Sequence, residues 1–304
     1  MVQVRTLDPT ETGIGPRHRG GALELAAAMP RLVVAARRTS ATVIHGLHGR
    51  RRSGTGENFW QFRRFASGES ASRVDWRRSA RGDHLYVREQ EWEAAHTVWI
   101  WIDRSRSMNF KSNLAQDSKV ERAVILALAL ADILVRGGER VGLLGLGAPT
   151  SSRRAVDILA ETLIHAGADE GLPRPAALSP LSEAVLIGDF LEPVDEIVQA
   201  VNGIAGRGAR GHLMAISDPV EETFPFSGRT EFIEPEGAGK FTFGRAQDLR
   251  ADYTRRLALH RDSLRDLATP IGWSIALHRT DRGASEALLA LHARLAERPE
   301  GLTG

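Results

Sequence analysis

The fold is decided by one stretch of sequence, Thr97-Val98-Trp99-Ile100-Trp101-Ile102-Asp103-Arg104-Ser105-Arg106-Ser107. Its first six residues are apolar or β-branched and run without a polar break up to an aspartate. Such a run is typical of a central parallel strand that is buried on both faces. Ligands of open α/β sheets gather outside the carboxyl ends of these strands. The polar side chains that follow the run are therefore predicted to lie at a binding site.

These side chains offer a set of oxygen ligands for a metal ion. Asp103, Ser105 and Ser107 alternate along the chain, so a turn that leaves the strand can direct their oxygens at one point. A second apolar run, 183–188, ends on Asp189. Hard cations such as Mg²⁺ prefer oxygen ligands. We predict a Mg²⁺ or Mn²⁺ site at these four residues; the alternative is that the first three only cap the turn.

From residue 96 onward, strand-like and helix-like segments alternate regularly. Strands are predicted at 97–103, 140–146, 183–188, 211–217 and 271–278, and a β-hairpin at 230–233 and 240–243. Helices are predicted at 119–136, 151–165, 193–204, 245–268 and 284–298. Strands separated by helices join through right-handed crossovers into a mostly parallel sheet with helices on both faces. The predicted fold of 96–304 is a doubly wound, Rossmann-like α/β domain, with Asp218 as a weaker acid at a third strand end.

The chain before this domain divides into two predicted parts. Residues 1–20 are polar and contain helix breakers, so we expect a flexible arm there. Residues 21–95 are predicted to form an N-terminal helix followed by a β-rich extension. The helix is expected at 22–38, kinked or split by Pro30, with a short strand at 42–45.

The composition excludes several classes of protein. The 304 residues include no cysteine, which excludes disulfides, thiolate metal sites and a cysteine nucleophile. The apolar patch at 22–36 is broken by Glu24, Pro30 and Arg31, so no signal peptide is predicted. The most apolar helix candidate, 123–135, is too short to span a bilayer. We expect a cytoplasmic protein without a membrane span.

The charge of the chain is unevenly distributed. The net charge is +2, yet residues 1–93 carry 16 arginines against 10 acidic residues. This excess permits nucleic-acid binding by the N-terminal third. The arginines are interspersed with acids, however, and no basic run with interleaved aromatic residues is present. We therefore favour an ion-paired surface and do not expect nucleic-acid binding.

The strand-end motif resembles that of the von Willebrand factor type A domain. In that family, a D-x-S-x-S motif, a threonine from a later loop and a further aspartate form a metal-ion-dependent adhesion site. Asp103, Ser105, Ser107 and Asp189 match the family positions. The threonine has no counterpart in the loop at 167–173, where it is expected. The resemblance implies a protein-interaction domain whose bound Mg²⁺ or Mn²⁺ meets a carboxylate of a partner.

The upstream segment resembles the bacterial domain-of-unknown-function 58 (DUF58) family. The matching residues are Gly54, Gly56, Glu57, Phe59, Arg63, Phe65, Gly68, Glu69, Arg73, Val74, Asp75, Trp76, Ser79, Ala80, Arg81, Leu85, Val87, Arg88 and Glu89. Later blocks match at 218–219, 224–226 and 278–281, so the resemblance covers roughly 30–298. It implies a partner of MoxR-type AAA+ ATPases and of other type A domain proteins, in a chaperone or metal-insertion system.

A non-enzymatic interaction module is the leading functional hypothesis. The alternative is a metal-dependent hydrolase or phosphoryl-transfer enzyme that uses the same cation. The sequence contains no phosphate loop, no dinucleotide fingerprint and no G-x-S-x-G or H-E-x-x-H motif. A second surface with partner-contact candidates lies upstream, at Arg73, Asp75, Trp76, Arg81 and Arg88. These residues either contact a partner or form an ion-pair network that holds the extension.

Overall fold

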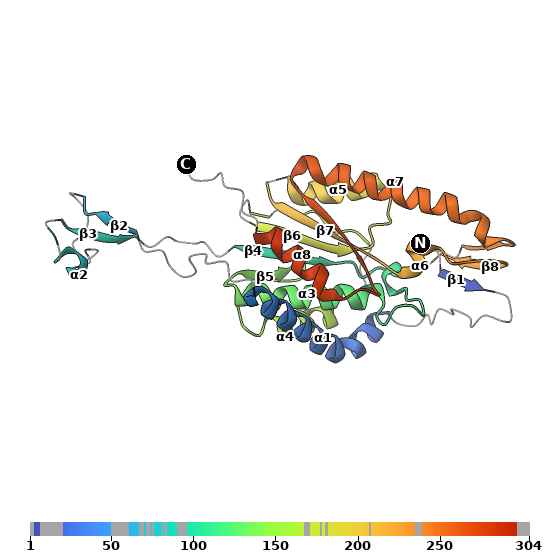
Figure 1. Ribbon diagram of the computed structural model, residues 1–304, viewed down its shortest axis with the longest axis horizontal. Coiled ribbons are helices and arrows are strands. Elements are labelled where there is room, and N and C mark those ends of the chain that lie inside the picture. The colour runs from blue at the N-terminus through green and yellow to red at the C-terminus, as the bar shows by residue number, and fades with distance from the viewer. Residues whose placement is uncertain are drawn as a thin grey trace. The chain divides into compact units, whose positions relative to one another are not determined.

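The structure, a computed structural model, describes residues 3–6, 21–49, 61–66, 70, 74, 76–80, 82, 84–89, 96–166, 171–176, 178–179, 182–206, 208–234 and 239–296. The chain forms two compact units (Figure 1). The larger unit contains Met1–Gly46 and His96–Gly304, and the smaller unit is Leu47–Ala95. The N-terminal helix, which we grouped with the β-rich extension, belongs to the larger unit.

A five-stranded parallel sheet forms the centre of the larger unit. Its strand order is β10-β7-β6-β4-β5, and every neighbouring pair is parallel. The strands are β4 (Thr97–Ile102), β5 (Arg140–Leu143), β6 (Ser182–Gly188), β7 (Arg210–Ser217) and β10 (Ser274–Arg279). In β4, Val98 and the last three residues, 100–102, are buried, and every residue of β6 is buried. The predicted doubly wound α/β fold is therefore confirmed.

The strand order reverses next to β4. The chain passes from β4 to β5 on one side, and β6, β7 and β10 then follow on the other side. Open α/β sheets bind ligands in the crevice at such a switch point, outside the carboxyl ends of the strands. The carboxyl ends of β4 and β6 lie at this switch point.

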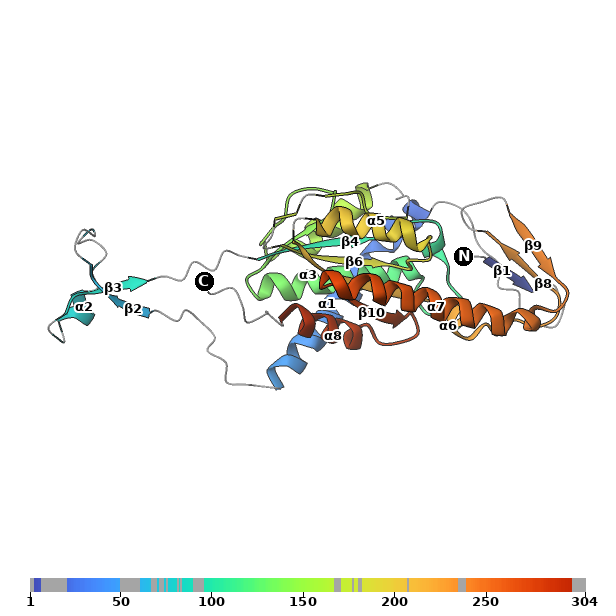
Figure 2. The same cartoon turned by 90° about the horizontal axis from the view of Figure 1, so that it is seen from above.

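Helices cover both faces of the sheet (Figures 1 and 2). One face carries α3 (Lys119–Arg136), α4 (Ala155–His165) and α8 (Ala284–Ala296), and α1 (Gly21–Gly49) packs against α3 and α4 on the same side. The other face carries α5 (Val194–Ala205) and α7 (Arg250–Ala268), which follows a 3₁₀ turn at Ala246–Leu249. No helix in the described parts of the chain combines the length and the apolar character needed to cross a membrane.

The first long helix corrects two predictions. It continues through Pro30 and extends to residue 49, so the strand expected at 42–45 is helical instead. The buried positions Ala36, Ser40 and Val43 recur at helical spacing, and Ser40 Oγ donates a 2.6 Å hydrogen bond to Asp132 on α3. This tertiary packing outweighs the local β-propensity.

Two arginines of this helix form ion pairs with acidic residues of the α/β domain. Arg31 pairs with Asp117 at 2.7 Å and with Glu121 at 2.5 Å. Arg37 pairs with Asp157 on α4 at 2.6 Å. These contacts agree with the ion-paired surface that we favoured for the N-terminal third.

A small antiparallel sheet lies beyond the carboxyl end of β7. Its order is β1-β8-β9, formed by β1 (Gln3–Thr6), β8 (Thr230–Ile233) and β9 (Lys240–Phe243). The short helix α6 (Pro219–Thr223) precedes it. The hairpin is present as predicted, whereas residues 3–6 of the predicted flexible arm form a strand.

The described residues of the smaller unit include an antiparallel pair of strands. β2 (Gln61–Arg64) pairs with β3 (Tyr86–Glu89), and the one-turn helix α2 (Trp76–Ser79) lies between them in sequence. The buried Ser79 hydroxyl accepts a 2.9 Å hydrogen bond from the amide of Tyr86. This contact joins α2 to β3.

Candidate metal site

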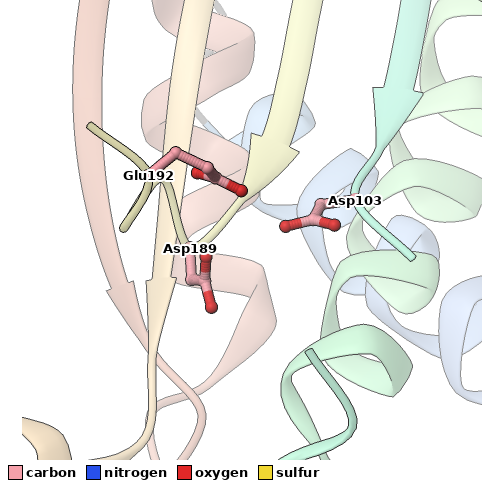
Figure 3. A group of neighbouring side chains, drawn as sticks. All are labelled: Asp103, Asp189 and Glu192. Atoms are coloured by element: carbon pink, nitrogen blue, oxygen red, sulfur yellow. The ribbon is translucent and has the colours of Figure 1, made fainter. Parts of the chain in front are cut away.

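Asp103 and Asp189 follow two neighbouring parallel strands and face each other. The amide of Asp103 donates a 2.8 Å hydrogen bond to the carbonyl of Ile187, which continues the pairing of β4 with β6 past the last strand residue. Both aspartates are buried, with exposed fractions of 1% and 6%. Figure 3 shows the two carboxylates just beyond the ends of these strands, together with that of Glu192. The structure thus brings the two predicted acids together.

Asp103 is anchored by only one of its carboxylate oxygens. Its Oδ1 accepts a 2.8 Å hydrogen bond from the amide of Ser105, so the capping alternative holds for that oxygen. Its Oδ2 is buried and has no hydrogen-bond partner among the described residues. A Cβ at Gly188 would lie 2.9 Å from the Cβ of Asp103 and 3.3 Å from Oδ2. The glycine therefore gives the Asp103 side chain the room it needs.

The two serines of the motif connect the aspartates. The 3₁₀ turn Ser107–Asn109 follows the motif and holds both hydroxyls inside the protein. Ser105 Oγ lies 3.0 Å from Ser107 Oγ, and Ser107 Oγ donates a 2.8 Å hydrogen bond to Asp189 Oδ2. All four predicted ligands therefore lie in one hydrogen-bonded cluster.

A buried lysine that we did not predict also contacts the cluster. Lys119, in the first turn of α3, has no exposed surface. Its ammonium donates to Asp189 Oδ2 at 2.7 Å and to Glu221 Oε1 at 2.9 Å. In the sequence, Arg104 and Arg106 are the basic residues that flank Asp103 and could pair with an aspartate of the cluster. The observed partner of Asp189 is instead Lys119 of α3, and Arg106 is exposed.

Glu192 is a third carboxylate that we did not predict. One oxygen each of Asp103, Asp189 and Glu192 lie within 4.8 Å of one another. Phe190 has a left-handed backbone (φ 49°), and beyond this turn the Glu192 side chain extends toward the side of Asp103 (Figure 3). A Cβ at Gly171 would lie 2.7 Å from Glu192 Oε1. Glu192 thus reaches the loop in which the type A threonine is expected.

The electrostatic balance of the cluster is uneven. Burial raises the pKa of Asp103 to about 8, and the negative charge of Asp189 adds to the rise. Burial acts on Asp189 as well, but the adjacent Lys119 outweighs it and holds the pKa of Asp189 below its usual range. Burial raises the pKa of Glu221 to about 7 against the attraction of the same lysine. The lysine therefore compensates Asp189, while Asp103 has no comparable countercharge.

The residues fit a hard divalent cation. The donors of the cluster are carboxylate and hydroxyl oxygens, which is the set that Mg²⁺ and Mn²⁺ prefer. The Oδ2 of Asp103 is buried and has no hydrogen-bond partner among the described residues. Among these residues, Lys119 pairs with Asp189, and no cation pairs with Asp103. A bound proton or a bound cation would satisfy the Asp103 carboxylate.

The other predicted residues have different outcomes. Asp218 caps α6 through Val220 and accepts a 2.9 Å hydrogen bond from the amide of Ser112, so it has a structural role. Trp76 in the smaller unit is 63% exposed, and Arg88 lies on β3. The remaining partner-contact candidates, Arg73, Asp75 and Arg81, lie outside the described residues.

Comparisons with known proteins identify relatives along most of the chain. The uncharacterized protein Rv1480 of Mycobacterium tuberculosis and the uncharacterized protein Mb1516 of Mycobacterium bovis are each 26% identical over 280 residues. These alignments cover 85% of this chain and 86% of each relative. Neither name states an activity.

Two solved structures are similar at a lower level. The conserved hypothetical protein BatB of Bacteroides thetaiotaomicron has 15% identity, and an aerotolerance-related membrane protein of Bacteroides fragilis has 17%. Each match has a TM-score of 0.38 and covers 67% of this chain and 100% of the other chain. A TM-score of this size does not establish a shared fold.

The family comparison is specific. The family "Protein of unknown function DUF58" matches residues 61–263, which include parts of both units and all the candidate ligands. This agrees with the DUF58 resemblance of the upstream segment around Arg73–Arg81. Because the match spans more than half of the chain, this protein belongs to the DUF58 family.

Proposed function

We propose that the protein is a non-enzymatic interaction module of the von Willebrand factor type A kind. Asp103, Ser105, Ser107 and Asp189 hold Mg²⁺ or Mn²⁺ at the switch point of the sheet. By family resemblance, the module serves as partner or adaptor of a MoxR-type AAA+ ATPase, together with other type A domain proteins. The observation that carries the metal site is the buried Oδ2 of Asp103, which has no hydrogen-bond partner in the described structure.

Glu192 replaces the missing threonine in this proposal. Its carboxylate comes from the same strand end as Asp189 and lies against Gly171, in the loop that supplies the threonine in the type A family. It is half-buried, whereas Asp103 and Asp189 are buried, so it forms the solvent side of the site. A bound divalent cation would supply the positive charge for a partner's carboxylate. That carboxylate would approach from the side of Glu192 and displace it.

Calorimetric titration with MgCl₂ and with MnCl₂ tests the metal site. We expect saturable binding to the wild type and none to Asp103→Ala. The control is Asp195→Ala, which removes an exposed acid of α5 outside the cluster and should bind as the wild type does. If the wild type binds neither metal, or if Asp103→Ala binds as tightly as the wild type, the metal site is refuted.

The hydrolase alternative is distinguished by a second assay on the same proteins. Mg²⁺-dependent hydrolysis of para-nitrophenyl phosphate that disappears in Asp103→Ala would replace the interaction function with an enzymatic one. Metal binding without hydrolysis agrees with the interaction module. The ATPase partnership is tested separately, by co-purification of a MoxR-type AAA+ ATPase with the wild type and with Asp103→Ala.

A further inference from the structure

An aromatic pocket of about 610 Å³ lies beside the carboxylate cluster. Six of the seven phenylalanines in the larger unit line it, namely Phe110, Phe224, Phe226, Phe232, Phe241 and Phe243. Glu221, which accepts from Lys119, lines it as well. The volume falls in the range of ligand pockets, roughly 300–1,000 Å³. The concentration of aromatic side chains at one place indicates a binding site.

The floor of the pocket is a preformed aromatic layer. Phe224, Phe226 and Phe232 are buried, with exposed fractions of 5%, 8% and 7%. The ring of Phe224 stacks on Phe232 at 5.8 Å and meets Phe226 edge-on at 5.1 Å. Tyr253 of α7 packs against Phe224 at 4.8 Å. Because these rings fix one another, an apolar group that enters the pocket meets a surface that is already ordered.

The rim of the pocket is exposed and apolar. Phe241 and Phe243 are 53% and 38% exposed, although both line the pocket. They are two residues apart on β9, so their side chains project from the same face of the strand. Phe243 contacts the buried Phe232 edge-on at 5.7 Å. Exposed rings that continue a buried aromatic layer are typical of an interaction surface.

The strand that carries this rim has an open edge. β9 is the last strand of its sheet and, among the described strands, pairs only with β8. All four of its residues are exposed. An extended peptide can add to such an edge through its main chain while its alternate side chains fill pockets on one face. A strand added to β9 would place alternate side chains on the face of Phe241 and Phe243, over the pocket.

One exposed arginine at the pocket favours an acidic residue in the partner. Arg255 and Arg256 both pair with a single carboxylate, Asp252, at 2.5 and 2.7 Å. Arg256 lines the pocket, and its side chain is 76% exposed. Because it shares its carboxylate with a second arginine, Arg256 offers positive charge to an acidic residue of an incoming segment.

We propose that an extended segment of a partner protein adds to β9 as a strand and inserts alternate bulky apolar side chains into the aromatic pocket, with an acidic residue beside Arg256. The open strand edge selects a polypeptide over a small apolar molecule. The docking does not require the cation, so it persists in EDTA and in Asp103→Ala. Failure of the metal site and failure of this docking site are therefore separate results.

The first test uses a random peptide library displayed on phage and selected on the full-length protein in EDTA. We expect the enriched peptides to carry bulky apolar residues at alternate positions and at least one acid. By fluorescence anisotropy, the synthetic peptides should bind Phe241→Ser about tenfold more weakly, as expected for loss of a central aromatic contact. The control is Leu259→Ser on α7, because Leu259 is 55% exposed, as Phe241 is, and does not line the pocket. Equal binding to the two variants overturns the proposal.

Further measurements keep the proposal testable if Phe241→Ser does not fold. Arg256→Glu, at an exposed position, should weaken binding of the acidic peptides. Peptides with N-methylated alternate amides should lose affinity, whereas unchanged affinity overturns strand addition. Absence of any enriched peptide while anilinonaphthalene sulfonate binds would show a small-molecule pocket and overturn the proposal. A dimer in solution that Phe241→Ser dissociates would show that β9 pairs with a second copy, which also overturns it.

Discussion

Replacement of Asp103 by asparagine is expected to stabilise the protein when divalent cations are removed. The carboxyl group is buried, and its Oδ2 has no hydrogen-bond partner in the described structure. Its burial and the charge of Asp189 raise its pKa from 3.8 to about 8. An asparagine has nearly the same shape, keeps an oxygen for the amide of Ser105 and carries no charge. The substitution therefore removes the cost of ionising a buried acid.

The size of the effect follows from the linkage between protonation and folding. Because the folded-state pKa lies above the unfolded value, the folded protein keeps a proton that the unfolded chain releases. The stability contributed by this proton is fully present below pH 3.8 and is lost as the pH rises toward about 8. The loss is about 1.4 kcal/mol per pH unit, or about 4 kcal/mol at pH 7. Asp103→Asn does not undergo this loss.

Urea unfolding in EDTA at several pH values measures the effect. The stability difference between Asp103→Asn and the wild type should grow by about 3 kcal/mol between about pH 5 and about pH 7, and should level off above about pH 8. Comparison across pH cancels any constant effect of the substitution. The exposed control Asp195→Asn should show no such trend. A stability difference that stays constant over this range would refute the electrostatic account of Asp103.

Two further substitutions test the packing around the cluster. Lys119→Met removes the buried ammonium shared by two carboxylates and should lower the free energy of unfolding, measured in urea, by about 3–5 kcal/mol. A decrease below about 1 kcal/mol would show that the lysine is not needed to compensate the carboxylates. Gly188→Ala places a Cβ 2.9 Å from the Cβ of Asp103 and should cost about 1–3 kcal/mol. Its control is Gly46→Ala in α1, where a Cβ meets nothing within 4 Å and where alanine favours the helix. Equal unfolding midpoints for the two alanine variants would contradict the predicted clash.

The fold was predictable because its signals are local. The apolar run before Asp103 and the alternation of strands and helices define a parallel sheet without knowledge of the long-range contacts. The convergence of Asp103 and Asp189 also follows, since parallel strands end at the same edge of a sheet. The strand expected at 42–45 was wrong because the packing of α1 against α3 outweighs local propensity there.

The residues that we missed depend on contacts between distant parts of the chain. Lys119 lies 70 residues from Asp189 and 102 from Glu221 in the sequence. The sequence of its helix indicates only a buried helix that is apolar on nearly all sides. A signal was present, since a lysine at the start of a buried helix is unusual in a chain whose cations are mostly arginine. Glu192 follows Asp189 by three residues, but only the left-handed turn at Phe190 directs it toward the cluster. No sequence pattern reveals that turn.

In the proposed site, the lysine and a bound cation would contact different oxygens, so they would not exclude each other. Ser107 and Lys119 both donate to Oδ2 of Asp189, whereas the amide of Ser105 is bonded to Oδ1 of Asp103. The second oxygen of Asp103 is buried without a partner in the described structure. Among the described residues, Lys119 pairs with Asp189, and no cation pairs with Asp103. This imbalance is the physical reason to propose a divalent cation at the two strand ends.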